Sequence, residues 1–505
     1  MEEQPQHGKP QPGKNRFTFP SALTVLAALT VLVWALAFVI PSGAYRRTPA
    51  GDPVQGTYHH EAAPGDAVHR IGQLFLAPVN GLYGIRDAKT GQIAPDATGA
   101  LYGSAGVFLF VLAIGTFITV VFATGALDRG IERLAHRLRD RGALLIAGIM
   151  TVFSLLGTVE GFAEETLGFY GLLVPLMLAL GYDRMVATGA IILGAGVGVL
   201  ASTVNPFATG VASSAAGVAL GEGIALRAAM WLVLTAVAIG YVVRYATRVR
   251  ADPARSLTGF RPGDRELAGK AAEPPELTRL QKTVLVLVTL VFAFMIFSVV
   301  PWSNALSGRS DAAPYRWEPD WSFAELAAFF LACSVLVGVV ARLGEQRLSA
   351  TVVRGAADFL APALVIVLAR GITAVMTNAK IIDTVLHSVE SAVRGTPAAF
   401  FGVMVFVVNL PLAFLIPSTS GHATLAMPVL APLAQFAGVS RALTVTAWQS
   451  ASGWMNLWVP TTAVVVGGVS LAKVGYDRYL RFVWPLLLLL AVLVCGFVAL
   501  GAALG

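Results

Sequence analysis

Three glutamates occur close together directly after the apolar run 142–158. A carboxylate near membrane depth is costly, so a residue of this kind marks an ion or substrate site by default. The adjacent pair Glu164 and Glu165 could hold a cationic amine, a sodium ion or a shared proton, whereas Glu160 stands apart from it. The alternative places all three at a water-exposed mouth of a hairpin. We predict that Glu164 and Glu165 bind substrate or ion.

Arg370 and His422 are two further titratable side chains inside apolar sequence. Arg370 lies in the run 359–376, beyond reach of the membrane surface if that helix is regular. Its guanidinium could bind a substrate carboxylate through two parallel hydrogen bonds, or it could pair with Asp358 or a glutamate as a structural lock. His422 could donate a hydrogen bond or relay a proton, or have a structural role. Both remain candidates for the binding site.

Hydroxyl and amide side chains gather in two stretches that are also rich in Gly and Pro. In hydrocarbon, broken backbone survives only inside protein or beside water, and broken helices near the midplane point to a transporter's binding site. The polar groups could satisfy one another, but their placement in two corresponding positions favours binding. The predicted ligands are Thr166, Ser202, Thr203, Asn205 and Thr209 in the first stretch, and Ser418, Thr419, Ser420, Thr424, Asn456, Thr461 and Thr462 in the second.

The two stretches share a pattern of residues along the chain. Pro206 and Pro460 match after a short gap, and arginine-bearing amphipathic segments precede each stretch at 128–141 and 379–394. Such self-similarity indicates a two-fold structural repeat. The positions that correspond at a constant separation of 257 residues are Pro175 and Pro432, Leu176 and Leu433, Gly181 and Gly438, and Arg184 and Arg441.

The composition is that of a membrane protein. Of the 505 residues, 56% are hydrophobic and 13% charged, which excludes an ordinary soluble enzyme and predicts an all-α polytopic fold. The net charge of +7 fits basic cytoplasmic loops, and no basic stripe interleaved with aromatics predicts nucleic-acid binding. Cys333 and Cys495 lie in apolar runs, as small core residues do, so we expect neither a disulfide nor a metal site.

The apolar run 17–40 is too long for the core of a signal peptide and is expected to remain as the first span. A polar linker after the run 225–245 divides the chain into halves. The predicted organisation is a cytoplasmic tail at 1–16, a first repeat at 17–245, the linker at 246–279 and a second repeat at 280–505. The first repeat contains a re-entrant hairpin at about 159–182 and an unwound loop at about 202–209. The second repeat contains a re-entrant hairpin at about 417–440 and an unwound loop at about 453–462.

The arginines predict that both segment 128–141 and the linker face the cytoplasm. However, three crossings lie between these two segments if 142–158 spans the membrane and each broken stretch is a re-entrant hairpin. An odd number of crossings cannot place both segments on the same side of the membrane, and the sequence leaves the side of the C-terminus open.

Four motifs resemble the YfcC family of membrane carriers, which is grouped with ArcD-type basic amino-acid antiporters and DcuC-type C4-dicarboxylate carriers. The resemblance runs from the first span to the last. The motifs are Ala-Glu-Glu-Thr-Leu at 163–167, Ala-Ser-Thr-Val-Asn-Pro-Phe-Ala-Thr-Gly at 201–210, Leu-Ala-Arg-Gly-Ile at 368–372 and Pro-Ser-Thr-Ser-Gly at 417–421.

This resemblance implies a member of the ion-transporter superfamily in a bacterial inner membrane. There, inverted repeats each supply a re-entrant hairpin and an unwound helix, one part moves as an elevator against a scaffold, and scaffolds commonly form homodimers. Sodium-coupled relatives carry Ser-Asn-Thr at the hairpin tips. The matching positions 163–165 and 420–422 lack that signature, which argues against sodium coupling. The expected coupling ion is therefore either Na⁺, bound near the hairpin tips in another way, or H⁺. The resemblance implies no other cofactor.

The absence of any Walker A or other nucleotide motif predicts a secondary active transporter rather than an ATP-driven pump. Glutamates together with an intramembrane arginine suit a basic amino acid, through arginine/ornithine-type exchange or cation-coupled uptake. The alternative is a C4-dicarboxylate or another carboxylate. A remote alternative, an intramembrane serine hydrolase built on Ser420 and His422, conflicts with the rule that triad members come from separate elements, so we expect no enzyme.

Overall fold

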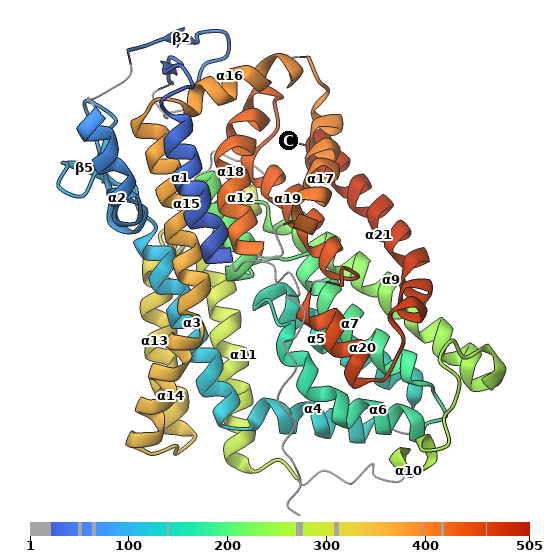
Figure 1. Cartoon of the computed structure of the whole chain (residues 1–505). Helices are drawn as coiled ribbons and strands as arrows, with labels where there is room; N and C mark the ends of the chain where they lie inside the picture. The colour runs from blue at the N-terminus through green and yellow to red at the C-terminus, as the bar shows by residue number, and fades with distance from the viewer. Residues whose placement is uncertain are drawn as a thin grey trace, which may run out of the picture.

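The computed structural model describes residues 22–48, 53–62, 67–138, 141–268, 276–307, 313–393, 395–415, 419–460 and 462–504. Ser418 and Thr461, and the predicted tail at 1–16, lie outside these residues. The described chain is mostly helical, and its helices form two bundles that lie side by side (Figure 1).

Bundle 1 contains the helices that pack around α3 and α15. Phe110 and Phe117 of α3 contact Phe330 of α13, with ring centroids 6.1 and 5.3 Å apart, and form the centre of its core. The helices of bundle 1 are α1 (Ala22–Leu36), α2 (Ala67–Tyr83), α3 (Ala105–Ala123), α11 (Arg279–Val299), α13 (Phe323–Val340), α14 (Glu345–Asp358) and α15 (Leu360–Asn378).

Bundle 2 has its own core, in which Phe153, Trp448 and Phe482 are fully buried and to which a few residues of α3 and α15 also contribute. Both halves of the sequence contribute to each bundle, so the bundles do not correspond to the two halves. The helices of bundle 2 are α5 (Gly142–Val159), α6 (Tyr170–Ala179), α7 (Arg184–Leu200), α8 (Val211–Ala216), α9 (Ile224–Ala251), α17 (Ala398–Leu415), α18 (Thr419–Phe436), α19 (Arg441–Asn456), α20 (Ala463–Leu471) and α21 (Tyr476–Leu504).

Seven helical stretches of the described chain are long and apolar enough to cross a membrane. They are α3, α5, α9, α11, α13, the continuous stretch Glu345–Asn378 and α21. Shorter elements connect them: α4 (Ala126–Arg137), η3 (Pro253–Arg255), α10 (Asp264–Ala268), α12 (Trp302–Ser307) and α16 (Ile382–Val393).

The segment between α1 and α3 contains two small antiparallel sheets, although the sequence predicts helices only. Its many Gly, Pro and Asp residues disfavour helix and permit short paired strands. Arg47 donates to Asp383 of α16 at 2.9 Å and ties one sheet to the bundles. The strands are β1 (Gly43–Ala44) paired with β2 (His59–His60), and β3 (Ile85–Asp87) between β4 (Ile93–Ala94) and β5 (Gly99–Leu101).

The helical path is broken in both stretches that the sequence singles out. After α5 the chain enters the 3₁₀ helix η1 (Glu164–Phe169) and then α6, and α7 gives way at 201–205 to a π turn, η2 (Pro206–Gly210), before α8. In the second stretch α19 is followed by 457–462 and α20. The sequence predicts this break from about 453, whereas α19 stays helical to Asn456 because Ser452, Gly453 and Trp454 are packed inside bundle 2.

Two turns at matching positions have the same local structure. Gly181 ends α6 and Gly438 ends α18, with φ of 79° and 68°, a conformation that glycine adopts without steric cost. In each turn the next amide donates to a carbonyl five residues earlier, at 2.9 and 2.8 Å. Asp183 and Ser440 then cap α7 and α19 by accepting backbone hydrogen bonds at 3.0 and 3.2 Å.

The arginine after each turn reaches the end of a short helix in the other stretch. Nη1 of Arg184 donates to the carbonyl of Ala472 after α20 at 3.0 Å, and Nη1 of Arg441 donates to the carbonyl of Ala216 in α8 at 3.2 Å. Carbonyls at a helix C-terminus lack intrahelical partners, and the helix dipole favours a cation there. The two stretches thus exchange equivalent contacts.

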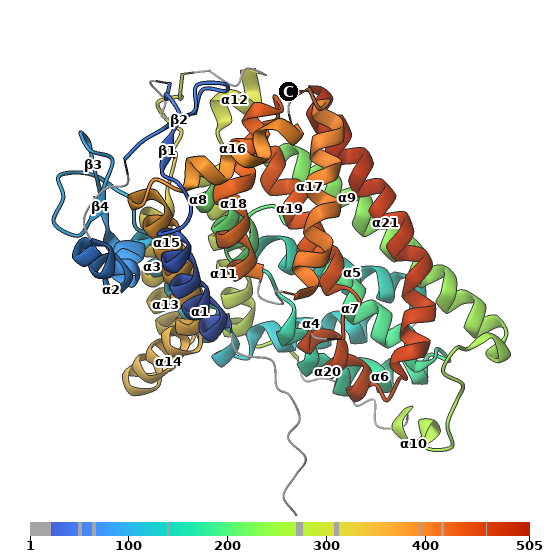
Figure 2. The same ribbon diagram turned by 45° about the horizontal axis from the view of Figure 1, so that its top comes forward.

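The path through bundle 2 returns to the same side of the molecule after α6 and again at the end of α9. Gly142 at the start of α5 lies against Tyr182 in the turn after α6, so α5 and α6 begin and end at one side of the molecule. Tyr245 near the end of α9 donates to Asp183 in that same turn at 2.6 Å. Helices α4 and α10 lie at one end of the molecule, opposite α16 and the C-terminus (Figures 1 and 2).

Helices α2 and α15 cross with their backbones in direct contact. A Cβ atom added to Gly81 would lie 2.1 Å from the carbonyl oxygen of Val367, and one added to Gly371 would lie 2.4 Å from that of Ala77. Glycine at both positions is what permits this approach.

Changing Gly81 to Ala should therefore lower the melting temperature and the folded yield, because the two helices must separate to admit the methyl group. The matched control is Gly72→Ala on the same helix, where an added Cβ meets nothing within 4 Å. This control should be neutral, or gain up to about 1 kcal/mol from helix propensity. Equal melting temperatures for the two variants in detergent would contradict the close crossing.

Candidate functional site

A cavity of about 810 Å³ lies between the two bundles, where both broken stretches meet. Its size falls within the range of small-molecule sites. Its walls come from three sources. Gly161, Ala163, Glu164, Glu165 and Asn205 belong to the first stretch, Thr419, Ser420, Asn456 and Thr462 to the second, and Ile118, Thr119, Phe122, Asp358, Phe359 and Pro362 to bundle 1.

The cavity is acidic. Glu164 and Glu165 open η1, and Asp358 faces them from bundle 1 as a third carboxylate in the lining. No Lys, Arg or His is among the described residues that line it. A cavity with this imbalance of charge favours a cation or a cationic group.

Glu160 lies behind the cavity wall and is only 5% exposed. Within the described part of the chain its side chain has neither a hydrogen bond nor an ion pair. Glu165, in contrast, accepts a hydrogen bond from the amide of Ala163 at 3.2 Å, which fixes one of its oxygens at the start of η1. Glu164 is exposed to the cavity, so it is the carboxylate with most freedom to bind a ligand.

Asn205 joins the two breaks of the first stretch. Its Oδ1 accepts from the amides of Phe207 and Ala208 at 2.9 and 3.3 Å and so caps η2. Gly161, with φ of 88°, lies directly against this side chain, since an added Cβ would be 2.8 Å from Oδ1. The loop after α5 and the unwound loop after α7 are therefore held together at the cavity wall.

Four predicted ligands of the first stretch form hydrogen bonds that stabilise the broken backbone. The hydroxyls of Ser202 and Thr209 bond to each other at 2.6 Å, and Thr203 bonds to the backbone and side chain of Thr158. The hydroxyl of Thr166 donates to the carbonyl of Ala163. None of the four belongs to the cavity lining.

Arg227, which is not among the ligands predicted from the sequence, completes this support. It is 1% exposed, and its guanidinium donates to the carbonyls of Thr203 at 3.0 Å and Leu220 at 2.8 Å. It thereby binds carbonyls on both sides of η2 and α8. Arg227 could have been recognised in the sequence, because an arginine near the start of an apolar helix and just after a broken segment is costly unless it has buried partners.

In the second stretch, four predicted ligands line the cavity. The amide of Asn456 donates to the hydroxyl of Thr419 at 3.4 Å, which connects the end of α19 to the start of α18. Ser420 and Thr462 are the other two. His422 instead faces the interior of bundle 2, where Nε2 lies 3.0 Å from Oδ1 of Asn409.

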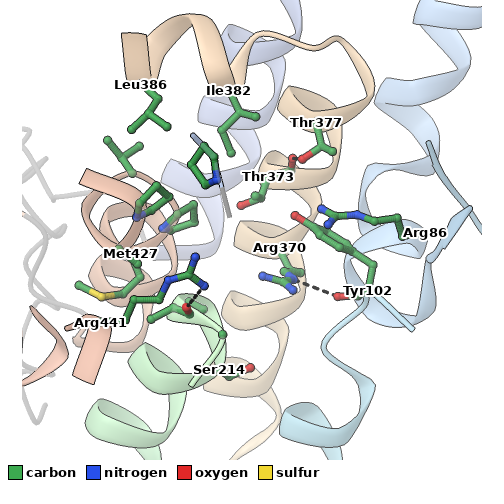
Figure 3. Close-up of a pocket in the computed structure, with 18 of the residues that line it drawn as sticks. Arg86, Tyr102, Ser214, Arg370, Thr373, Thr377, Ile382, Leu386, Met427 and Arg441 are labelled. Carbon is green, nitrogen blue, oxygen red and sulfur yellow. Dashed lines mark hydrogen bonds between the residues drawn. The ribbon is translucent and has the colours of Figure 1, made fainter. Parts of the chain in front are cut away.

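Thr424 donates back to the carbonyls of Ser420 and Gly421 in its own helix and lies outside the cavity. Arg370 lies in a different pocket, nearer the α16 end (Figure 3). Its Nε donates to the carbonyl of Tyr102 at 3.0 Å. Asp358, its suggested partner, is instead 3.9 Å from Arg354 on α14.

Replacing Asn205 with Ala should remove the η2 cap and lower the stability of the folded protein by about 1 kcal/mol. Asn205→Ser is the matched control, because serine keeps a neutral oxygen acceptor at this position and should retain most of the stability. Melting temperatures of the two variants in the same detergent provide the test. Indistinguishable values would mean that the cap does not hold the unwound loop.

The DcuC family model, described as a C4-dicarboxylate anaerobic carrier, matches residues 19–503. A protein of Haemophilus influenzae is 30% identical over 508 residues, which cover 94% of this chain and 95% of that protein. YfcC of Escherichia coli, a proposed basic amino acid antiporter, is 30% identical over 421 residues, covering 81% and 79% of the two chains.

Two solved transporters share the fold. The YdaH transporter of Alcanivorax borkumensis has a TM-score of 0.69 at 15% identity, over 95% of this chain and 98% of that one. MtrF of Neisseria gonorrhoeae, from a class of antimetabolite efflux pumps, has a TM-score of 0.70 at 14% identity, over 95% of each chain. Together with the family match over nearly the whole length, these likenesses confirm the resemblance drawn from the sequence: the chain is a multi-pass membrane carrier of the DcuC family, related to YfcC.

Proposed function

We propose that the central cavity is the substrate and coupling-ion site of a secondary active transporter, and that its substrate is a basic amino acid. The observation that carries this proposal is the charge of the cavity. Glu164, Glu165 and Asp358 line it, without a basic side chain among its described residues. A cationic side chain or an α-amino group would be stabilised there, in a site with limited water.

The carboxylate of such a substrate would bind at the opposite wall. Thr419 and Ser420 begin α18, and both line the cavity. A helix N-terminus offers free N–H groups and the positive end of the helix dipole, and the Asn456 amide adds a donor. One wall of the cavity thus suits an amine and the other a carboxylate, which matches a zwitterion with a second positive charge.

The family description supports a second candidate, a C4-dicarboxylate. That substrate would bring two negative charges beside Glu164 and Glu165. It fits only if these glutamates hold Na⁺ or H⁺, so its uptake would require a coupling cation. An intramembrane hydrolase is not proposed, because His422 is engaged with Asn409 rather than with Ser420.

We further propose that the halves are inverted repeats and that bundle 2 moves against bundle 1 as an elevator. Three features support this: the matching glycine turns, the reciprocal arginine contacts and two hydrophobic clusters that are centred on different bundles. Thr119, Phe122 and Asp358 also line a neighbouring cavity next to α14. The arginines of α4 and α14 favour a cytoplasmic location for this end, and we propose that the cavity opens toward it.

The double variant Glu164→Gln with Glu165→Gln should abolish uptake while leaving the melting temperature close to that of the parent, because the amides keep the shape and remove the charge. Transport by purified protein in proteoliposomes measures the first effect. Glu345→Gln, at the exposed start of α14, removes one negative charge outside the cavity lining; it is the control and should transport normally. Normal uptake by the double variant would remove the carboxylates from the mechanism.

Substrate class is tested by uptake of labelled arginine, ornithine and succinate, each with and without imposed sodium and proton gradients. We expect saturable uptake of arginine or ornithine, stimulated by the other amino acid on the opposite side if the carrier exchanges them. Succinate should neither be taken up nor compete. Cation-dependent succinate uptake without transport of either amino acid would favour the dicarboxylate alternative.

A further inference from the structure

A second pocket, of about 360 Å³, lies between the two bundles near the α16 end (Figure 3). Four arginines line it, and we call it the arginine pocket. Arg47, Arg86 and Arg370 come from the β1–β2 segment, β3 and α15, and Arg441 comes from the start of α19. The only carboxylate among its described lining residues is Asp383. The arginine pocket is therefore strongly basic, the opposite of the central cavity.

Asp383 does not balance this charge. Both of its oxygens accept from the guanidinium of Arg47 at 2.9 Å, and Oδ2 also accepts from the amide of Tyr45 at 3.1 Å. Neither Arg86 nor Arg370 forms an ion pair with any residue that the structure describes. Two guanidinium groups thus face the pocket without an acidic partner.

Arg86 and Arg370 share one aromatic ring. Their guanidinium carbons lie 4.8 and 4.1 Å from the centroid of Tyr102. Each contact is a cation–π interaction, but two cations on one ring also repel each other. Burial lowers the pKa of Arg86, and the nearby charges of Arg47 and Arg370 lower it further.

The wall contributed by bundle 2 is mostly apolar, and Ser214 and Arg441 are its two polar side chains. Ser214 in α8 lines the pocket, and its hydroxyl makes no hydrogen bond within the described chain. Arg441 projects from bundle 2 toward the same space that Arg370 faces from α15 (Figure 3). Its Nη1 is held by the carbonyl of Ala216, which fixes the direction of the side chain. Donors from both bundles therefore converge on one volume.

We propose that the arginine pocket is a second binding site, for a compact oxyanion such as a carboxylate or phosphate group, and that the bound anion bridges the two bundles. Guanidinium groups bind both anions through paired, charge-assisted hydrogen bonds. The anion would relieve the repulsion between the arginines and connect Arg370 of bundle 1 to Ser214 of bundle 2. This proposal does not depend on the substrate of the central cavity.

The test measures the melting temperature of the whole protein in a neutral detergent while phosphate or succinate replaces chloride at constant ionic strength. A saturable rise is expected for the parent protein. Arg370→Gln should shift the half-maximal anion concentration upward by about tenfold or more, since a hydrogen bond to a charged group is lost. Arg244→Gln, an exposed arginine on α9, removes the same charge elsewhere and should respond like the parent.

Ser214→Val keeps every arginine and fills the wall of the pocket from bundle 2. It should also lose the anion response, which would show that both bundles are needed, and it keeps the test valid if Arg370→Gln folds poorly. The double variant Glu164→Gln with Glu165→Gln should keep the response, which separates this site from the central cavity. Equal responses in the parent, Arg370→Gln and Ser214→Val would overturn the proposal.

The source of the anion is resolved by two further arms. If soluble anions bind, phosphate and succinate act in detergent alone. If the ligand is a lipid headgroup, phosphatidylglycerol should raise the melting temperature where phosphatidylcholine does not, and only with Arg370 and Ser214 intact. The absence of any Arg370-dependent effect from phosphate, succinate or phosphatidylglycerol would refute the site.

Discussion

Helices that break inside a membrane leave backbone groups that water cannot reach, and the rest of this structure depends on how those groups find partners. Arg184 and Arg441 bind carbonyls at the ends of the short helices α20 and α8. Arg227 and Asn205 do the same around η2, one through carbonyls and the other through amides. Hydrogen bonds from long cationic side chains on neighbouring helices thus replace the missing backbone hydrogen bonds and hold the broken segments in place.

This demand also decides which polar residues remain for function. The side chains of Ser202, Thr203 and Thr209 form hydrogen bonds with one another or with the end of α5, and so they stabilise the break. The Glu164 side chain forms no hydrogen bond to the broken backbone among the described residues, and it faces the cavity. This difference has a chemical cause. A hydroxyl can donate a hydrogen bond to a backbone carbonyl without burying a charge, whereas an ionised carboxylate has no proton to donate to a carbonyl and attracts cations.

Much of the fold could be predicted from sequence, because apolar length and glycine or proline position are local properties. Gly181 and Gly438 are recognisable by spacing alone, and the helices begin and end close to the expected residues. The return of the chain through α6 to the side where α5 begins could not be predicted, since it depends on packing of α6 against α7 and of Tyr182 against Gly142. Nor could the depth of Arg370 reveal which way it faces. Gly371, the next residue, packs α15 against α2 and turns Arg370 toward Tyr102.

The two pockets between the bundles carry opposite charge, and this follows from where each bundle supplies its ionisable groups. Acidic residues come from the broken stretch after α5 and from the end of α14, and arginines come from the α16 end. A molecule bearing both an amine and a carboxylate would be drawn to different ends by its two groups. If bundle 2 moves as an elevator, Arg441 and Ser214 move relative to Arg370, so the arginine pocket exists in full in only one arrangement of the bundles. An anion that binds it must then favour that arrangement, because a ligand shifts a conformational equilibrium by its difference in affinity between the two states.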